Sequence, residues 1–188
     1  MPRELRLPFD PIDRAGENWE RIWGTATAMR AATSLFRAQQ ILLSRFDEAL
    51  RPYELTFARY EALVLLRFSR TGTLPLKVIG SRLMVHPTSV TNTVERLAAA
   101  GLVDRQPNPA DGRGVLASIT VTGRDIVERA TADLMDIDFG LANISNERLD
   151  ELYETLREVR YAAGDVAGGD PALSGPRRRS RAHDRSSH

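Results

Sequence analysis

A short segment in the middle of the chain carries side chains suited to chemistry with a nucleic acid. Four Ser or Thr residues and one Asn fall within Thr88–Thr93, and Arg96 follows shortly after. Hydroxyl groups can bond phosphates or bases, and an Asn amide matches the edge of adenine. Polar and β-branched residues are poor helix formers, so this composition is costly for an ordinary helix surface. The segment therefore favours contact with DNA over the alternative of a solvated helix surface.

The ends of the same segment carry helix signals. His86 can cap the helix, and Pro87 suits its first position because proline lacks an N–H group. Gly101 is placed to stop it. Three apolar residues recur at helical spacing and would hold the helix to a domain: Val90, Val94 and Leu97. The pattern predicts a helix over Pro87–Ala100, whose first N–H groups would also suit a phosphate.

The elements before this helix position it. A helix is expected from a Thr56 cap to about Ser69, and a short helix over Leu76–Met84. Two helices joined by a tight turn, the second rich in small polar side chains, are typical of a helix-turn-helix. In that motif the second helix enters the major groove.

A β-hairpin is expected directly after the helix. VDRQP and VLASITVT have strand character, and the loop between them is full of Asn, Pro, Asp and Gly. The loop places Asp111 and Arg113 at its tip, where an arginine can enter a minor groove. A surface turn with an incidental ion pair is the alternative. Together, residues 55–121 are predicted to form a winged helix-turn-helix, so the fold class is mainly α with a small β-hairpin wing.

The flanking regions are predicted from composition and periodicity. Residues 1–16 suggest a flexible arm, and 17–54 a helical region. Residues 122–162 suggest two helices, the first opened by a capping box at Thr122 and Asp125. Residues 163–188 suggest a disordered, Arg-rich tail. The second of the two helices carries a heptad-like apolar ladder: Leu149, Leu152, Leu156 and Val159.

Charge is distributed unevenly along a chain whose net charge is only +1. Residues 67–124 carry eight basic and three acidic side chains, whereas residues 125–160 carry four basic and ten acidic ones. A basic middle segment places positive potential near the predicted helix-turn-helix, as expected of a nucleic-acid binder. The RRRSR run at Arg177–Arg181 could add nonspecific phosphate affinity, or it could be a solvated tail.

Several classes of protein are excluded by what the sequence lacks. With no cysteine there is no disulfide framework, thiolate metal site or thiol redox sensor. Three scattered histidines make a metal site improbable, and no cofactor is expected. No nucleophile triad, P-loop or dinucleotide fingerprint is present, so an enzyme is not expected. Without a signal peptide or a membrane-spanning stretch, the expected location is the cytoplasm.

Two motifs resemble the MarR family of bacterial transcriptional regulators. They are T-x-x-V-E-R-L-x-x-x-G-L-V-x-R at Thr91–Arg105, and D-x-R followed by L-x-x-I-T-x-x-G at Asp111–Gly123. The resemblance covers roughly residues 30–160. It implies a homodimer with intertwined terminal helices, a recognition helix at Pro87–Ala100 and a wing at Arg105–Val121. Gly112 departs from many relatives, which carry Arg there, and this weakens the phosphate grip expected of the wing.

The resemblance and the residues together predict the DNA-contacting set. Its members are Pro87, Thr88, Ser89, Thr91, Asn92, Arg96, Arg105, Asp111 and Arg113. The predicted function is a sequence-specific regulator, a repressor, that binds a pseudo-palindromic double-stranded operator as a homodimer. Its DNA affinity would be modulated by a small, aromatic ligand, whose binding residues the sequence does not reveal. The alternative is a winged-helix module that binds a protein partner instead of a specific DNA sequence.

Overall fold

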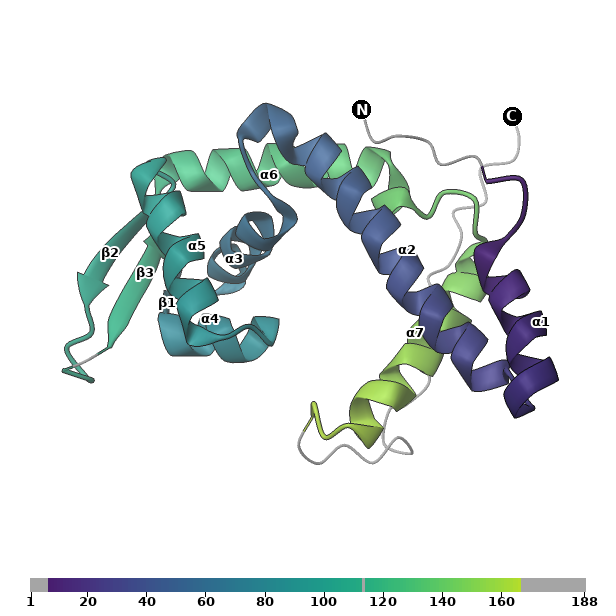
Figure 1. The fold of residues 1–188 in the computed structure, drawn as a ribbon. Helices are drawn as coiled ribbons and strands as arrows, with labels where there is room; N and C mark the ends of the chain where they lie inside the picture. The colour runs from purple at the N-terminus through teal and green to yellow at the C-terminus, as the bar shows by residue number, and fades with distance from the viewer. Residues whose placement is uncertain (1–6, 113, 167–188) are drawn as a thin grey trace, which may run out of the picture. The chain divides into compact units, whose positions relative to one another are not determined.

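The computed structural model describes residues 7–112 and 114–166, and the chain divides after Ala142 into two compact units. Helices dominate, and three short strands form one antiparallel sheet (Figure 1). The predicted fold class, a mainly helical winged helix-turn-helix, is confirmed.

The chain begins with two helices, α1 (Pro11–Trp23) and α2 (Thr27–Leu50). The expectation of a flexible arm over residues 1–16 is wrong from Pro11 onward; residues 1–6 lie outside the described part. Asp10 caps α1, because its Oδ1 accepts from the N–H of Ile12 at 2.7 Å, and Pro11 occupies the first helical position. The helical region expected over residues 17–54 is interrupted, because Gly24, with φ +93°, separates α1 from α2.

The winged helix-turn-helix region begins with α3 (Phe57–Phe68), and its helix-turn-helix motif consists of α4 (Leu76–Leu83) and α5 (Pro87–Ala99). All three helices follow the predicted bounds closely. Gly80 lets α4 approach α5: a Cβ at this position would lie 3.0 Å from Cγ2 of Val90. At the end of α5, the N–H groups of Gly101 and Leu102 donate to the carbonyls of Ala98 and Leu97, respectively. This is a Schellman arrangement at the glycine that was predicted to stop the helix.

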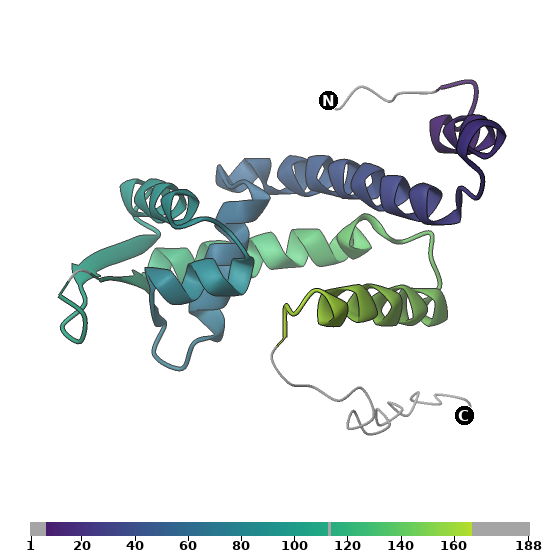
Figure 2. The ribbon, with the colours of Figure 1, turned by 60° about the horizontal axis from the view of Figure 1, so that its bottom comes forward.

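The sheet has the strand order β1 (Thr73–Pro75), β3 (Val115–Ile119), β2 (Val103–Pro107). The predicted hairpin is β2 and β3, paired from Val103 with Ile119 to Pro107 with Val115. Its loop projects beyond the helices in both views (Figures 1 and 2). Strand β1 was not predicted; it pairs with β3 on the other side, where the hydroxyls of Thr73 and Ser118 lie 2.8 Å apart.

Helix α6 (Val121–Asp136) begins two residues earlier than the sequence suggested. The predicted capping box at Thr122 and Asp125 is wrong. Thr120 is the cap, because its hydroxyl accepts from the N–H of Gly123 at 2.9 Å and donates to the carbonyl of Gly101 at 2.9 Å. Gly123 is needed for this close approach, since a Cβ there would lie 2.2 Å from the carbonyl oxygen of Leu102.

One apolar core joins these elements within the first unit. Fully buried side chains come from the end of α2, from α3, α4, α5 and α6, and from the base of the sheet: Leu50, Leu63, Leu66, Ile79, Val94, Leu97, Val103, Val127 and Leu134. Two tyrosines add polar links to α6. The hydroxyl of Tyr60, on α3, lies 3.1 Å from the hydroxyl of Thr131. The hydroxyl of Tyr53, in the short 3₁₀ helix η1 (Arg51–Tyr53), donates to Oδ2 of Asp133 at 2.8 Å. The core therefore fixes α5 and the hairpin relative to each other.

After α6 the first unit closes with the 3₁₀ turn η2 (Asp138–Gly140), and the second unit contains α7 (Asn146–Ala162). The predicted apolar ladder lies on α7, with Leu152 and Val159 exposed. Residues 163–166 are described as a turn, and most of the predicted tail, 167–188, lies outside the described residues. No helix in the described part of the chain is long and apolar enough to cross a membrane.

Candidate nucleic-acid interface

Helix α5 presents one apolar side to the core and one polar side to solvent. Val90, Val94 and Leu97 are buried, as predicted. The opposite side forms a shallow depression, here called the α5 groove, lined by Pro87, Thr88, Thr91, Asn92, Glu95, Arg96 and Ala99. Five of the nine predicted DNA-contacting residues are therefore brought together on one surface. Ser89 is exposed but is not among the lining residues.

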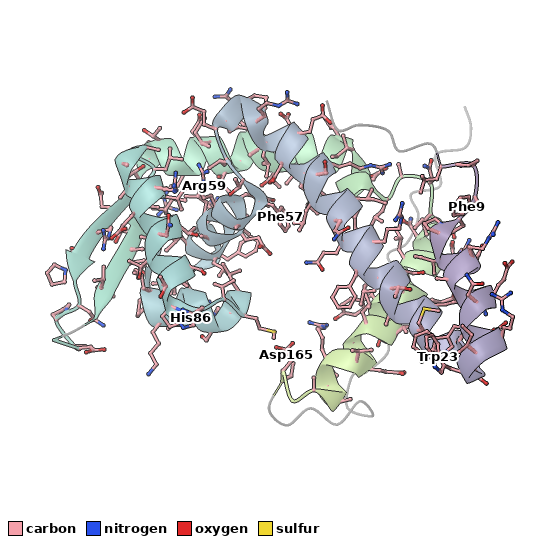
Figure 3. All side chains as sticks on the ribbon, in the orientation of Figure 1. Phe9, Trp23, Phe57, Arg59, His86 and Asp165 are labelled. Atoms are coloured by element: carbon pink, nitrogen blue, oxygen red, sulfur yellow. The ribbon has the colours of Figure 1, made fainter. Side chains whose placement is uncertain are left out.

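The first turn of α5 satisfies its own backbone groups. His86 lies at the turn between α4 and α5 (Figure 3), and its Nδ1 accepts from the N–H of Thr88 at 3.3 Å. The N–H of Ser89 donates to the carbonyl of His86 at 2.9 Å, and Pro87 has no N–H. The expectation that free N–H groups at this helix start suit a phosphate is thus not met. Side chains must supply the hydrogen bonds to a ligand.

Two of the groove side chains are bonded to each other. Nε of Arg96 donates to Oδ1 of Asn92 at 2.9 Å, one helical turn earlier. An Asn amide recognises adenine by accepting from N6 and donating to N7. Because Arg96 engages the amide oxygen, Asn92 can read adenine only when that oxygen turns to the base. The pair places a cation and an amide at the same point of the groove.

Helix α5 and the wing are joined by an ion pair. Nη1 of Arg105, on β2, lies 3.1 Å from Oε1 of Glu95, and both side chains are partly exposed. Arg105 was predicted as a DNA contact, and the structure places it at the base of the wing beside α5. Glu95 was not predicted, although its spacing of three residues from Asn92 places it on the same helix face.

The wing loop is organised by short backbone bonds. The N–H of Asn108 donates to the carbonyl of Gly114 at 2.9 Å, and the N–H of Gly114 donates to the carbonyl of Asp111 at 2.8 Å. The side chain of Asn108 accepts from the N–H of Ala110 at 3.0 Å, which closes a turn. Asp111 is exposed at the tip, away from the α5 groove residues. Arg113, the second predicted tip residue, lies outside the described residues.

A sequence model of the MarR family matches residues 53–114, from η1 to the wing loop. The crystal structure of Sco5413, a MarR family transcriptional regulator from Streptomyces coelicolor, is 58% identical, with a TM-score of 0.70. The match covers 74% of this chain and 96% of Sco5413. The chain belongs to the MarR family. The recognition made from Thr91–Arg105 and Asp111–Gly123 is thereby confirmed.

Two further relatives are more distant. The HTH-type transcriptional regulator YhbI of Bacillus subtilis is 26% identical over 154 residues, which are 82% of this chain and 89% of YhbI. A crystal structure of a mutant of Escherichia coli MarR complexed with operator DNA has a TM-score of 0.64 at 24% identity, and covers 71% of this chain and 96% of that one. This second likeness concerns the fold. Helix α1 lies before the segment that the family model matches.

The α5 groove of this MarR-family protein is lined by side chains that form hydrogen bonds and carry charge. Within residues 7–112 and 114–166 no three His, Asp or Glu side chains are arranged to hold a metal ion. The family and its relatives are transcriptional regulators. The α5 groove offers hydroxyls, an amide, a carboxylate and a guanidinium, which are the groups that read base edges.

Proposed function

We propose that this protein is a repressor that binds a pseudo-palindromic operator as a homodimer, with α5 in the major groove. The observation that carries the proposal is the α5 groove, in which Thr88, Thr91, Asn92 and Arg96 share one exposed face of a helix fixed from behind by the core. A mutant of Escherichia coli MarR, a structural neighbour of this chain, has been crystallised in complex with operator DNA. Repression follows if the bound dimer excludes other proteins from the same duplex.

In this proposal the contacts divide by chemistry. Asn92 reads adenine, and the methyl and hydroxyl groups of Thr88 and Thr91 contact thymine or phosphate. Arg96 and Arg105 neutralise phosphates, which sets affinity and its dependence on salt. Ser89, Pro87, Asp111 and Arg113 stay in the predicted contact set, with Arg113 proposed to enter the minor groove.

The homodimer is proposed from apolar side chains that the first unit and α7 leave exposed. On α1 and α2 these include Ile22, Trp23, Leu35, Phe36 and Ile41, with Trp23 70% and Phe36 65% exposed. On α7 they include Leu152 and Val159. Exposed apolar side chains gathered on the same helices suit contact with a second copy of the chain. A two-fold dimer presents two copies of α5 about one helical turn apart on DNA, roughly 34 Å.

Modulation by a small ligand is proposed at a second depression, between η1, α3, the second half of α5 and the start of α6. Its apolar lining includes Leu55, Leu97, Leu102 and Ile126. Two arginines, Arg59 and Arg96, outnumber the one acidic side chain in the lining, Glu54. Apolar walls with a few polar groups suit a small molecule, here an aromatic anion. Because Arg96 also lines the α5 groove, an anion that engages it competes with DNA for the same guanidinium.

Footprinting the purified protein on the DNA upstream of its own gene tests the proposal. We expect protection of one short segment with two related half-sites, retained in the presence of excess random duplex. Light scattering should give the mass of a dimer. If no segment is protected, and the protein instead retains a protein partner in pull-down experiments, the winged-helix interaction module replaces the regulator proposed here.

A further inference from the structure

Glu95 is an acidic side chain within a surface proposed to face DNA. It lines the α5 groove one turn after Thr91 and Asn92, and its side chain is 53% exposed. A carboxylate close to a phosphate backbone is repelled by it, so an acid at this position costs affinity for every duplex. That cost is offset while the carboxylate is paired with a cation, or where it finds a hydrogen-bond donor on the DNA.

The major groove offers few donors to a carboxylate. Guanine presents the acceptors N7 and O6, and thymine presents O4 and a methyl group. Adenine presents the donor N6 beside the acceptor N7, which repels a carboxylate. Cytosine presents the donor N4 with no neighbouring acceptor, and is the base that Glu and Asp recognise. A carboxylate in the α5 groove therefore discriminates in favour of cytosine and against the other bases.

Arg105 is the partner of this carboxylate in the structure. The guanidinium lies 3.1 Å from Oε1 of Glu95, and it is also the cation at the base of the wing that is proposed to contact a phosphate. On a duplex with cytosine opposite Glu95, Arg105 can move to the phosphate while N4 of cytosine replaces it at the carboxylate. Opposite any other base, the same exchange leaves the Glu95 carboxylate facing a hydrogen-bond acceptor. The ion pair with Arg105 is then lost and no hydrogen bond to the base replaces it.

We propose that Glu95 determines one base of each half-site, a cytosine, and that the Glu95–Arg105 ion pair is the contact that the correct operator exchanges. The inference rests on the proposed function, since it assumes that α5 enters the major groove. It assigns a specificity to a residue that the predicted contact set did not contain.

The variants that test it are matched in shape. Glu95→Gln keeps the size of the side chain but adds an amide donor, and Gln recognises adenine through N6 and N7. Glu128→Gln is the control. Glu128, on α6, pairs with Arg67 at 3.0 Å with both side chains exposed, an ion pair of the same kind outside the α5 groove. Any effect of losing a surface ion pair should appear in both variants.

Each full-length protein is used to select duplexes from a pool with a randomised stretch of about three helical turns. We expect the wild type and Glu128→Gln to enrich the same half-site with one invariant cytosine. Glu95→Gln should enrich adenine at that position. On the duplex selected by the wild type, replacing the cytosine should weaken wild-type binding between about 5-fold and 150-fold, and should change Glu95→Gln binding to a smaller extent or improve it when adenine is introduced.

Affinity for random duplex gives an independent measurement. Glu95→Gln should bind it more tightly than the wild type, because a negative charge is removed and Arg105 is released, whereas Glu128→Gln should not. The inference is overturned if the wild type and Glu95→Gln select the same half-site, in which case the proposed function stands with other residues reading the sequence. If the wild type enriches no sequence at all, both the inference and the proposed function fail.

Discussion

Asp47 of α2 caps a helix that begins ten residues later. Its Oδ1 accepts a hydrogen bond from the backbone N–H of Phe57, the first residue of α3, at 2.8 Å. Thr56 occupies the cap position of α3 in the chain, with extended backbone angles, but its side chain makes no capping bond. The carboxylate of one helix thus replaces the hydroxyl that local sequence would assign as the cap, and links α2 to α3, the first helix of the winged helix-turn-helix region.

Removal of the Asp47 carboxylate should destabilise the protein, whereas removal of the Thr56 hydroxyl should not. Losing an N-cap acceptor typically costs about 1 kcal/mol, within a range of roughly 0.5–2 kcal/mol. We expect Asp47→Ala to lower the free energy of unfolding by about that amount, and Thr56→Ala to change it by less than about 0.5 kcal/mol. Urea denaturation of both variants measures the difference, and the reverse order would assign the cap to Thr56.

Arg105→Ala should weaken binding to the operator more than binding to random duplex, because Arg105 is proposed to reach a phosphate only where a cytosine replaces it at Glu95. The operator duplex is therefore the one used for the salt titration. The slope of log affinity against log salt should fall by about one unit. Arg67→Ala, which breaks the ion pair with Glu128 outside the α5 groove, is the control and should leave the slope unchanged. A salt titration in which DNA binding is monitored by fluorescence anisotropy measures the slope for both variants. An unchanged slope for Arg105→Ala would show that this residue does not contact DNA.

Charges placed on the apolar ladder of α7 should dissociate the proposed homodimer. Replacing Leu152 and Leu156 together with Asp puts two carboxylates where apolar side chains are proposed to meet the second copy. Light scattering at micromolar concentration should then give a monomer mass, with loss of tight operator binding. Glu151→Lys, a charge change outside the ladder on the same helix, should leave a dimer. A dimer mass for the Leu152 and Leu156 double variant would place the interface elsewhere.

Glu61, on α3, makes the free energy of unfolding depend on pH. Partial burial raises the pKa of its carboxyl above the ordinary value of 4.5. The folded protein therefore holds this proton more tightly than the unfolded chain, and the free energy of unfolding falls as pH rises from 4.5 through the folded pKa. Glu61→Gln removes the cost of an ionised, half-buried carboxylate. The variant should be more stable than the wild type at about pH 7 and equal to it near pH 3 in denaturation curves; a variant less stable at neutral pH would contradict the argument.

The sequence predicts those elements whose signals are local. Helix α5 carries its own start at His86 and Pro87, its own apolar side and its own glycine stop, so its bounds could be predicted within a residue. Helix α1 has an equally local signal, Asp10 followed by Pro11, but the surrounding prolines and charges suggested an arm instead. The start of α6 was misplaced because Thr120 and Val121 continue the alternation of β3 while already belonging to the helix and its cap.

Features that depend on the tertiary structure could not be predicted. Strand β1 has three residues, one of them a proline, and exists because β3 pairs with it. The Glu95–Arg105 pair joins residues ten apart across a glycine turn, and its geometry follows from how the hairpin packs against α5. Five members of the predicted contact set share the α5 groove because helical periodicity places them there, whereas the proximity of Arg105 to that face depends on the hairpin.

The central claim, that α5 reads a specific DNA sequence, is tested most directly by comparing Asn92→Ala with the wild type on two duplexes. One is the segment protected in footprinting, and the other is its scrambled counterpart. Asn18→Ala is the control, because Asn18 also accepts a bond from an arginine, Arg21, but on α1. We predict that Asn92→Ala loses about 1–3 kcal/mol on the protected duplex and little on the scrambled one, while Asn18→Ala loses nothing on either. Equal losses on both duplexes, or none on the protected one, would contradict sequence reading by α5.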